Sequence, residues 1–197
     1  MVSCLDVTEK ERQLKELEDS KALIQEATSI AKLGYWSTDL RTNEFIWSEE
    51  VYKIWEVDPQ VFKPDFDIFY QSIHADDRAE FDYLQPLALS GERSFDFVHR
   101  IYTPSGKIKW VHEKGRVKFD EKGVPISFSG TAQDITAQKE EEQHLKLLES
   151  VITHTDDIVM ITEAEPLESP GPRIQYVNQA FTKLTGYTLE EVKGQSP

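Results

Sequence analysis

The sequence predicts an α+β domain in which short helices cover one face of an antiparallel sheet, and three observations carry that prediction. Helical patterns flank the central part of the chain at residues 8–32 and 137–156. Three long alternating segments follow one another over residues 94–135 with TPSG and DEKG between them, which is typical of an antiparallel meander. Two shorter strands and several short helices precede this meander, and that order indicates an α+β domain.

The first predicted element is a helix from Thr8 to about Lys32. Thr8 and Glu11 make the S/T-x-x-E pattern of a capping box, which satisfies two free backbone donors. Apolar residues recur along this helix at coiled-coil spacing, so we expect it either to pair with a second copy or to pack on its own domain. The seam consists of Val7, Leu14, Leu17, Ile24 and Ala31, with Lys10, Lys21 and Thr28 at its weaker positions.

Two short strands are predicted after that helix. Gly34 is expected to end the helix, and GYWSTDL and EFIWS then read as strands at residues 34–40 and 44–48 with a polar turn between them. Ser48 is expected to cap a short helix that ends before Pro59, because its hydroxyl can accept a hydrogen bond from a free N–H of the first turn.

Two further helical stretches are predicted at residues 66–74 and 76–89. Asp77 and Glu80 make a second capping-box pattern at the start of the later one. Pro86 lies inside the same stretch, and because proline has no backbone N–H we expect it to bend or interrupt the helix.

Two histidines in this region call for separate interpretations. His74 stands at a predicted helix start, where a capping or packing role is expected. His99 belongs to the first long strand and shares a face with apolar neighbours. A histidine in such a place can ligate haem iron, but it is more often a hydrogen-bonded core residue, and that is our expectation here. The shared face consists of Phe95, Phe97, His99 and Ile101.

Composition limits the classes of function. The chain has 197 residues and a formal net charge of −14, which disfavours binding to nucleic acid or to anionic membranes. No apolar run approaches the length of roughly 18 residues that spans a bilayer, and the N-terminus lacks a signal-peptide core, so we expect a cytoplasmic location. Cys4 is the single cysteine, which excludes an internal disulfide and a cysteine metal cluster.

No catalytic motif is found in the sequence. It lacks a P-loop, a G-x-G-x-x-G motif and a G-x-S-x-G nucleophile elbow, and it shows no ATP-binding or cyclase signature. We therefore expect no catalytic residues and no metal ligands in this chain.

Residues from about Ile24 to Gln138 resemble a PAS domain with its C-terminal PAC motif. The matching stretches, in the expected order, are LGYWSTDL, FIWSEEVYKIWEVDP, IHADDRAEFDYL, FDFVHRIYTPSGKIKWVHEKGRV and GTAQDIT. The resemblance implies a five-stranded antiparallel sheet in the order 2-1-5-4-3 with helices on one side. It also implies a sensory role, in which a small molecule or a partner is bound and the signal passes through the flanking helices.

A weak internal repeat points to a second, similar domain. VNQAFTKLTGY aligns with WSEEVYKIWEV, so that Phe181 meets Val51 and Leu184 meets Ile54. The sequence is interpreted as four parts. They are an N-terminal helix at 1–33, a PAS/PAC sensory domain at 34–136, a linker helix at 137–156 and the truncated start of a second PAS domain at 157–197.

Cofactor chemistry can be weighed against the same resemblance. Light-sensing relatives carry a cysteine in a G-x-N-C-R-F-L-Q motif. The first domain has no such motif, and the second has Gly194 to Pro197 with proline where the thiol would stand, so a cysteinyl-flavin adduct is excluded. Neither haem nor non-covalent flavin is expected, and no other cofactor is predicted.

The predicted function is a sensory PAS module that dimerises through its N-terminal helix and controls an output domain in the same polypeptide. A sensor histidine kinase is the expected parent; the alternatives are a cyclic-dinucleotide (diguanylate) cyclase or phosphodiesterase, and a ligand-free dimerisation or protein-interaction module. Asp134, Ile135 and Thr136 are expected to couple the sheet to the linker helix. The candidate ligand-pocket residues are Trp47, Ile54, Phe69, Phe81, Phe97 and His99.

Overall fold

The computed structural model describes residues 4–165 and 171–197 and divides the chain into two compact units, Met1–Ala137 and Gln138–Pro197. Side chains are described from residue 9 onward, except those of residues 24 and 25 and of the undescribed segment. The elements of the first unit are α1 (Cys4–Ile30), β1 (Leu33–Asp39), β2 (Glu44–Trp47), α2 (Glu49–Trp55), α3 (Phe66–Ser72), η1 (Ala75–Asp77), α4 (Arg78–Leu89), β3 (Phe95–Tyr102), β4 (Ile108–Phe119) and β5 (Pro125–Asp134).

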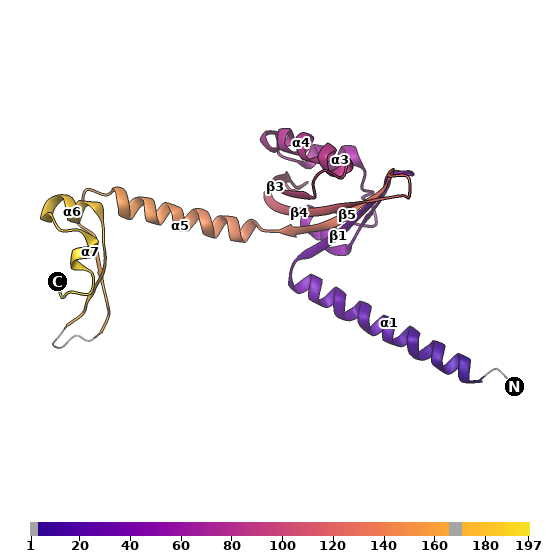
Figure 1. Cartoon of the computed structure of the whole chain (residues 1–197), viewed down its shortest axis with the longest axis horizontal. Helices are drawn as coiled ribbons and strands as arrows, with labels where there is room; N and C mark the ends of the chain where they lie inside the picture. The colour runs from indigo at the N-terminus through magenta and orange to yellow at the C-terminus, as the bar shows by residue number, and fades with distance from the viewer. Residues whose placement is uncertain (1–3, 166–170) are drawn as a thin grey trace. The chain divides into compact units, whose positions relative to one another are not determined.

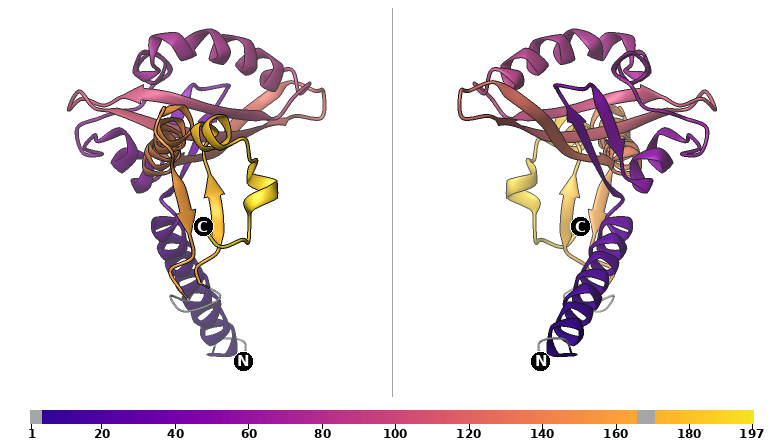
Figure 2. Two further views of the ribbon diagram at one scale, coloured as in Figure 1. Left: turned by 90° about the vertical axis from the view of Figure 1, so that its left-hand side faces the viewer. Right: turned by 90° about the vertical axis from the view of Figure 1, so that its right-hand side faces the viewer.

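The first unit contains a five-stranded antiparallel sheet in the order β2-β1-β5-β4-β3 (Figure 1). The three long strands form the predicted meander, and the central strand β5 pairs with β1 on one side and with β4 on the other. Helices α3 and α4 lie on one side of this sheet (Figure 2). The α+β class, the strand order and the single helical face are therefore confirmed.

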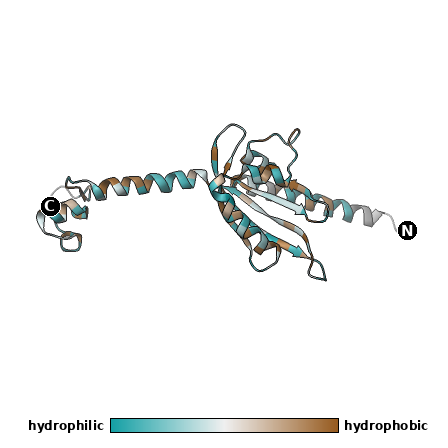
Figure 3. Cartoon of the chain, turned by 90° about the horizontal axis from the view of Figure 1, so that it is seen from above, coloured by the Kyte–Doolittle hydropathy of each residue, from teal (hydrophilic) through white to brown (hydrophobic). Residues whose placement is uncertain are grey.

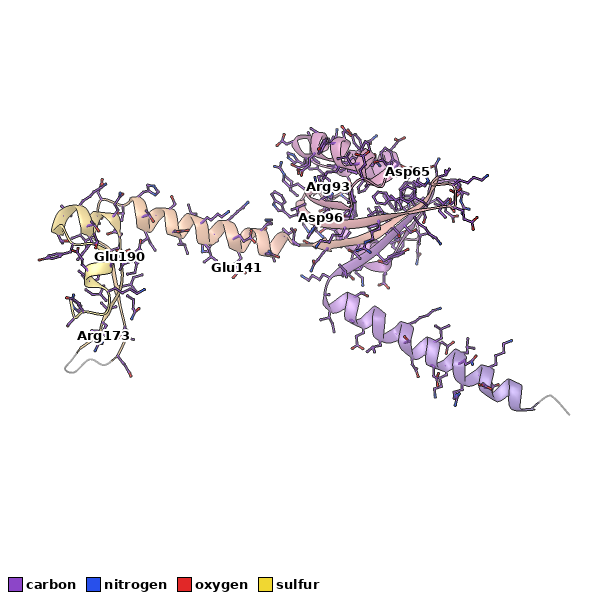
Figure 4. The ribbon with its side chains drawn as sticks, viewed as in Figure 1. Asp65, Arg93, Asp96, Glu141, Arg173 and Glu190 are labelled. Atoms are coloured by element: carbon purple, nitrogen blue, oxygen red, sulfur yellow. The ribbon has the colours of Figure 1, made fainter. Side chains whose placement is uncertain are left out.

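The core lies between the helices and the inner face of the sheet. One cluster joins α4 to β3 and β5 and is built around Phe81, Phe95 and Phe97. A second cluster joins α2 to the other end of β3 and to β4, with Trp55, Ile101 and others. Inner positions alternate strictly with outer ones along β3, because successive side chains of a strand point to opposite faces. The outer face carries polar contacts, such as the one of 2.7 Å between His112 and Asp96, beside exposed apolar residues such as Val98. Asp96 is labelled in Figure 4.

The first helix ends earlier than predicted. It stops at Ile30, Lys32 adopts a left-handed φ of 50°, and Gly34 lies inside β1. Gly34 serves a close approach instead of a helix stop, because a Cβ placed there would overlap Cγ2 of Val51 in α2. The glycine thus lets α2 pack directly on β1.

Two predicted caps have other partners in the structure. Ser48 is at the N-cap position of α2, but its Oγ makes no cap hydrogen bond and accepts instead from the Tyr35 N–H at 2.9 Å. Asp77 makes no cap hydrogen bond to α4; its carboxylate binds Arg100 in β3. His74 does cap η1, since its Nδ1 accepts from the Asp76 N–H at 3.3 Å. In both cases a residue distant in the sequence competes with the free N–H groups of the helix for the side chain that was expected to cap it.

Pro86 does not interrupt α4, which continues to Leu89. The proline stands in the last turn. Because it has no backbone N–H, the helix lacks one backbone hydrogen bond there. Ala88 is buried against the core, and the Ser90 N–H donates to the Pro86 carbonyl at 2.9 Å. Packing and this closing bond hold the final turn in place.

The predicted seam of α1 is only partly described. The side chains of Val7, Thr8 and Ile24, and with them the capping box, lie outside the described residues. Leu14 and Leu17 are 57% and 52% exposed. They therefore do not pack on the first unit, so the alternative of an amphipathic helix lying on its own domain finds no support at these two positions.

The second unit contains most of α5 (Thr136–His154), followed by β6 (Met160–Thr162), β7 (Ile174–Val177), α6 (Gln179–Thr185) and α7 (Leu189–Val192). The first turns of α5 are mostly hydrophilic, and its hydrophobic residues lie in the second half of the helix (Figure 3). A small core forms around Phe181, whereas Leu184, its companion in the repeat, is 69% exposed. Asn178 caps α6 through the Phe181 N–H and also donates to the Ile152 carbonyl at the end of α5. Among the described residues no helix is long and apolar enough to cross a membrane.

Candidate functional site

A cavity of about 140 Å³ lies in the first unit between the sheet and its helices. Its wall is mainly aromatic and comes from all five strands, from α2, α3 and α4 and from the β1–β2 turn. The lining residues are Trp36, Thr38, Leu40, Asn43, Phe45, Trp47, Val51, Trp55, Phe66, Phe69, Phe81, Gln85, Leu89, Phe95, Glu113 and Phe128.

A row of residues across the sheet makes room for one wall of the cavity. Trp36 pairs with Trp47 on one side and with Gly130 on the other, and Gly130 pairs with Gly115. A Cβ at Gly115 or Gly130 would lie 2.9 or 2.8 Å from the Trp36 ring. The two glycines therefore leave the space in which the indole of Trp36 lies, edge-on to Phe128 with 4.8 Å between the ring centroids.

The neighbouring row places a carboxyl group on the inner face. Glu113 pairs with Phe97 in β3 and with Ala132 in β5, and both partners are buried. Glu113 itself is only 3% exposed. Burial raises the pKa of Glu113 from 4.5 to about 8, because a carboxylate loses hydration there. With this pKa the side chain is mostly a neutral acid at pH 7.

His99 lies two residues further along β3 on the same face. It is fully buried, and neither ring nitrogen has a hydrogen-bond partner among the described residues. Its ring stacks on Phe97 with 4.2 Å between centroids. Burial lowers the pKa of His99 from 6.5 to about 4, so the imidazole is neutral at pH 7. His99 is thus a core residue, as expected, and its closest ring contact is the stacking on Phe97.

The six sequence-predicted pocket residues divide into two groups. Trp47, Phe69 and Phe81 line the cavity. Ile54, Phe97 and His99 are buried in the adjacent core but are not part of the lining.

Sequence reasoning missed the polar groups of the wall, above all Glu113. The alternation of β4 carries a usable signal, because Val111, Glu113 and Gly115 occupy successive inner positions.

Arg100 and Asp77 fasten β3 to the helical layer beside the cavity. The Asp77 Oδ2 accepts from the Arg100 backbone N–H at 2.8 Å and from its Nε at 3.0 Å, and Oδ1 accepts from Nη2 at 2.6 Å. The Arg100 guanidinium lowers the pKa of Asp77 below its usual value. This bidentate pair fixes the start of α4, whose inner face carries Phe81 and Gln85 into the cavity wall.

The predicted coupling residues form the joint between β5 and α5. Asp134 Oδ1 accepts from the Thr136 N–H at 3.0 Å, and the Ile135 N–H donates to the Trp110 carbonyl at 2.9 Å. Thr136 Oγ1 accepts from the Trp110 N–H at 3.0 Å. Because the Thr136 hydroxyl binds β4, the first residue of α5 is held by the sheet.

Lys109 connects this joint to α2. Its Nζ lies 3.6 Å from an Asp134 carboxylate oxygen and 3.3 Å from one of Glu56, and it donates to the Ile54 carbonyl at 3.0 Å. Hydrogen bonds from Ser105 and Lys107 come first among the causes that lower the pKa of Glu56 to about 2. Because Val51 and Trp55 of α2 line the cavity, one lysine joins the helix at the cavity to the start of α5.

Within the described part of the chain, no group of three or more His, Cys, Asp or Glu side chains could hold a metal ion. The cavity, by contrast, can enclose a small molecule, and the joint can carry a displacement of α2 or β5 to the start of α5.

Family models match both units. The model described as PAS fold matches residues 44–132, and the one described as PAS domain matches residues 146–196. With the strand order above, these matches show that the chain belongs to the PAS family and carries parts of two such domains.

Similar proteins include signalling proteins from several bacteria. The chain is 23% identical over 186 residues to the probable diguanylate cyclase DgcE of Escherichia coli, covering 92% of this chain and 16% of that protein. It is 24% identical over 149 residues to a blue-light-activated histidine kinase of Brucella anthropi, covering 74% and 29%.

A solved sensory box histidine kinase/response regulator from Burkholderia thailandensis superposes with a TM-score of 0.56 at 26% identity, covering 64% of this chain and 95% of that one. The chain thus spans well under a third of the length of both curated relatives, although it matches nearly all of the solved structure.

Proposed function

We propose that the chain is a sensory input region in which the cavity of the first PAS domain receives a small molecule and the joint at Asp134, Ile135 and Thr136 passes its presence to α5. The observation that supports this most is Lys109, which contacts both the end of α2 and Asp134. A ligand that moves α2 must disturb these contacts, because Val51 and Trp55 belong to the cavity wall.

The output function belongs to the whole protein. The relatives are named as a histidine kinase and a probable diguanylate cyclase, and the chain spans a small part of each. We propose a sensor histidine kinase as the parent and a cyclic-dinucleotide enzyme as the alternative, with the output domain in the same polypeptide. No haem or flavin is needed for this function, and Cys4, the single cysteine, lies outside the PAS domains.

We also propose that the chain forms a homodimer through α1. Leu14 and Leu17 lie on the predicted seam and are each more than half exposed in the single chain. Pairing of two α1 helices would bury them, and apolar side chains at heptad spacing favour such pairing. A dimerisation module without a ligand is the second candidate function, and these exposed leucines are the observation that favours it.

A substitution that fills the cavity distinguishes the two candidate functions. Gln85 of α4 is half-buried and lines the cavity, whereas Tyr83 on the same helix is 64% exposed. We expect Gln85→Trp to abolish the response of the full-length parent's output to its stimulus and Tyr83→Trp to preserve it. A normal response in Gln85→Trp would show that the cavity is not the sensory site and would leave the dimerisation module as the function.

A further inference from the structure

The cavity contains one ionisable group among its described lining residues, and that group is an acid. Glu113 stands among aromatic and aliphatic side chains, one hydroxyl and two amides, and the described lining includes no Lys, Arg or His. An anionic ligand would therefore meet no countercharge in the wall. A cationic one would meet a carboxyl group.

The Glu113 carboxyl makes no hydrogen bond within the described part of the chain, and burial is the only cause of its altered pKa. Its neighbours in register, Phe97 and Ala132, have no polar side-chain atoms. A buried polar group without a partner costs free energy, so a carboxyl kept at this place needs a compensating contact. The cavity that Glu113 lines is where such a contact can arrive.

Three indole rings of the wall also favour a cation. Trp36, Trp47 and Trp55 line the same cavity, and the rings of Trp47 and Trp55 lie 5.1 Å apart. Indole faces attract organic cations more strongly than other aromatic rings do. The cavity of about 140 Å³ is close to the size that accommodates one six-membered ring, since an apolar cavity of about 150 Å³ binds benzene.

We propose that the cavity binds a small organic ammonium cation, about one ring in size, whose N–H groups donate to the carboxylate of Glu113 while the tryptophans enclose its apolar part. This proposal rests on the sensory function proposed above and specifies the class of ligand. A protonated amine joined to one ring meets both requirements.

Binding of such a cation must release a proton. Before binding, Glu113 is mostly the neutral acid at pH 7, and the ammonium group pairs with the carboxylate. The ligand keeps its own proton, and the Glu113 proton passes to the solvent, so up to one proton leaves for each ligand bound. A neutral ligand of the same shape releases none.

The pH dependence of this step belongs to Glu113. Among the described residues, β5 and the helices add no ionisable side chain to the cavity lining. On β3 the nearest titratable residue of the same face is His99, and its pKa of about 4 keeps it neutral above pH 5. The affinity for the cation should therefore rise from pH 6 to pH 8 and then level off.

The test uses isothermal titration calorimetry on the full chain with benzylamine, benzyl alcohol and benzoate as probes, in two buffers that differ in ionisation enthalpy. We expect benzylamine to bind at least about tenfold more tightly than benzyl alcohol, because its ammonium group makes a charge-assisted hydrogen bond with the carboxylate. We expect benzoate to bind most weakly. Only benzylamine should show proton release.

Two variants isolate the carboxyl. Glu113→Gln keeps the shape of the side chain and should lose the preference for benzylamine while retaining benzyl alcohol binding. Glu121→Gln removes the same charge from the exposed β4–β5 turn and should bind as the wild type does. The proton-release measurement on the wild type needs no variant, so a folding defect in Glu113→Gln would not prevent the test.

Benzyl alcohol binding as tightly as benzylamine, an absence of proton release, or no binding of any probe would overturn the ammonium proposal. In each case the sensory function is judged separately, by the response of the Gln85→Trp parent. A lost response there with no preference for benzylamine would mean a sensor of another ligand class.

Discussion

Thr136 and Trp110 are joined by a hydrogen bond in which the Trp110 backbone N–H donates to Thr136 Oγ1 at 3.0 Å. This bond connects the first residue of α5 to β4. A second hydrogen bond, from the Ile135 N–H to the Trp110 carbonyl, connects the preceding residue to the same strand. A helix whose first residue and preceding residue are both bonded to the sheet follows the sheet, whereas a glycine-rich linker would absorb the motion.

Thr136→Val should loosen the first turns of α5. The substitution keeps the side-chain shape and removes the acceptor of the Trp110 N–H, which we expect to cost about 1 kcal/mol. Hydrogen exchange over residues 137–145 should become faster. Thr131→Val, in the preceding strand β5 and without a side-chain hydrogen bond to the described chain, is the control and should exchange as the wild type does. Equal exchange in both variants would contradict the role given to Thr136.

Lys109→Met should separate α2 from the joint. Lys109 is 16% exposed and contacts Glu56, Asp134 and the Ile54 carbonyl, whereas Lys107 is 67% exposed and contacts Glu56 alone. We expect Lys109→Met to raise hydrogen exchange at the end of α2 and the start of α5 together, because removing one partner of a half-buried charge network leaves the other charges unpaired. Lys107→Met should change neither region, and a similar effect from both variants would count against the proposed path.

Glu113 should make the protein less stable as the pH rises from 6.5 to 8. The folded state keeps the Glu113 proton up to about pH 8, while the unfolded chain has released it above 4.5, so the folded state binds more protons in this interval. The free energy of unfolding of Glu113→Gln relative to wild type should therefore increase by about 1.5 kcal/mol between pH 6.5 and pH 8. Chemical denaturation at several pH values measures this, and a constant difference would show that Glu113 is ionised in the fold.

His99 should make the protein more stable as the pH rises from 4.5 to 6.5. The unfolded chain protonates His99 below 6.5, whereas the folded state does so only below about 4. Wild-type stability should gain about 2 kcal/mol from this group between pH 4.5 and pH 6.5, and His99→Phe should lack that gain. The comparison is again by denaturation, with exposed His144→Gln as the control. A parallel pH profile in His99→Phe and wild type would mean that the imidazole has an unseen partner.

Leu14→Glu with Leu17→Glu should convert a homodimer into a monomer in sedimentation velocity, because both residues lie on the proposed seam of α1. Leu23 is also exposed on α1 but stands off the seam, so Leu23→Glu should leave the dimer intact. If neither variant changes the sedimentation of a dimer, its interface lies elsewhere.

The sheet could be predicted from sequence because alternation and turn chemistry are local signals. The strict inner and outer pattern of β3 and the turns on either side of β4 set the meander. The caps at Ser48 and Asp77 were wrong because their actual partners, Tyr35 and Arg100, lie 13 and 23 residues away in the chain. A capping-box pattern spans only four residues, so it does not show that such distant residues compete for the capping side chain.

The cavity was harder to predict than the sheet. Aromatic residues are abundant in the core, and sequence alone does not show which of them leave a space between them. Gly115 and Gly130 create that space only through their register with Trp36. Glu113 could have been placed on the inner face from the alternation of β4, but its lack of a partner appears only when Phe97 and Ala132 are seen beside it.

The most direct test of the coupling is hydrogen exchange in α5 of Asp134→Ala. This change removes the acceptor of the Thr136 N–H and the carboxylate beside Lys109 together, and Asp156→Ala, beyond the end of α5, is the control. We expect faster exchange over residues 137–145 in Asp134→Ala, wild-type exchange in Asp156→Ala, and loss of regulated output only in the Asp134→Ala parent. Wild-type exchange and wild-type regulation in Asp134→Ala would show that β5 and α5 meet in an ordinary connection that carries no signal.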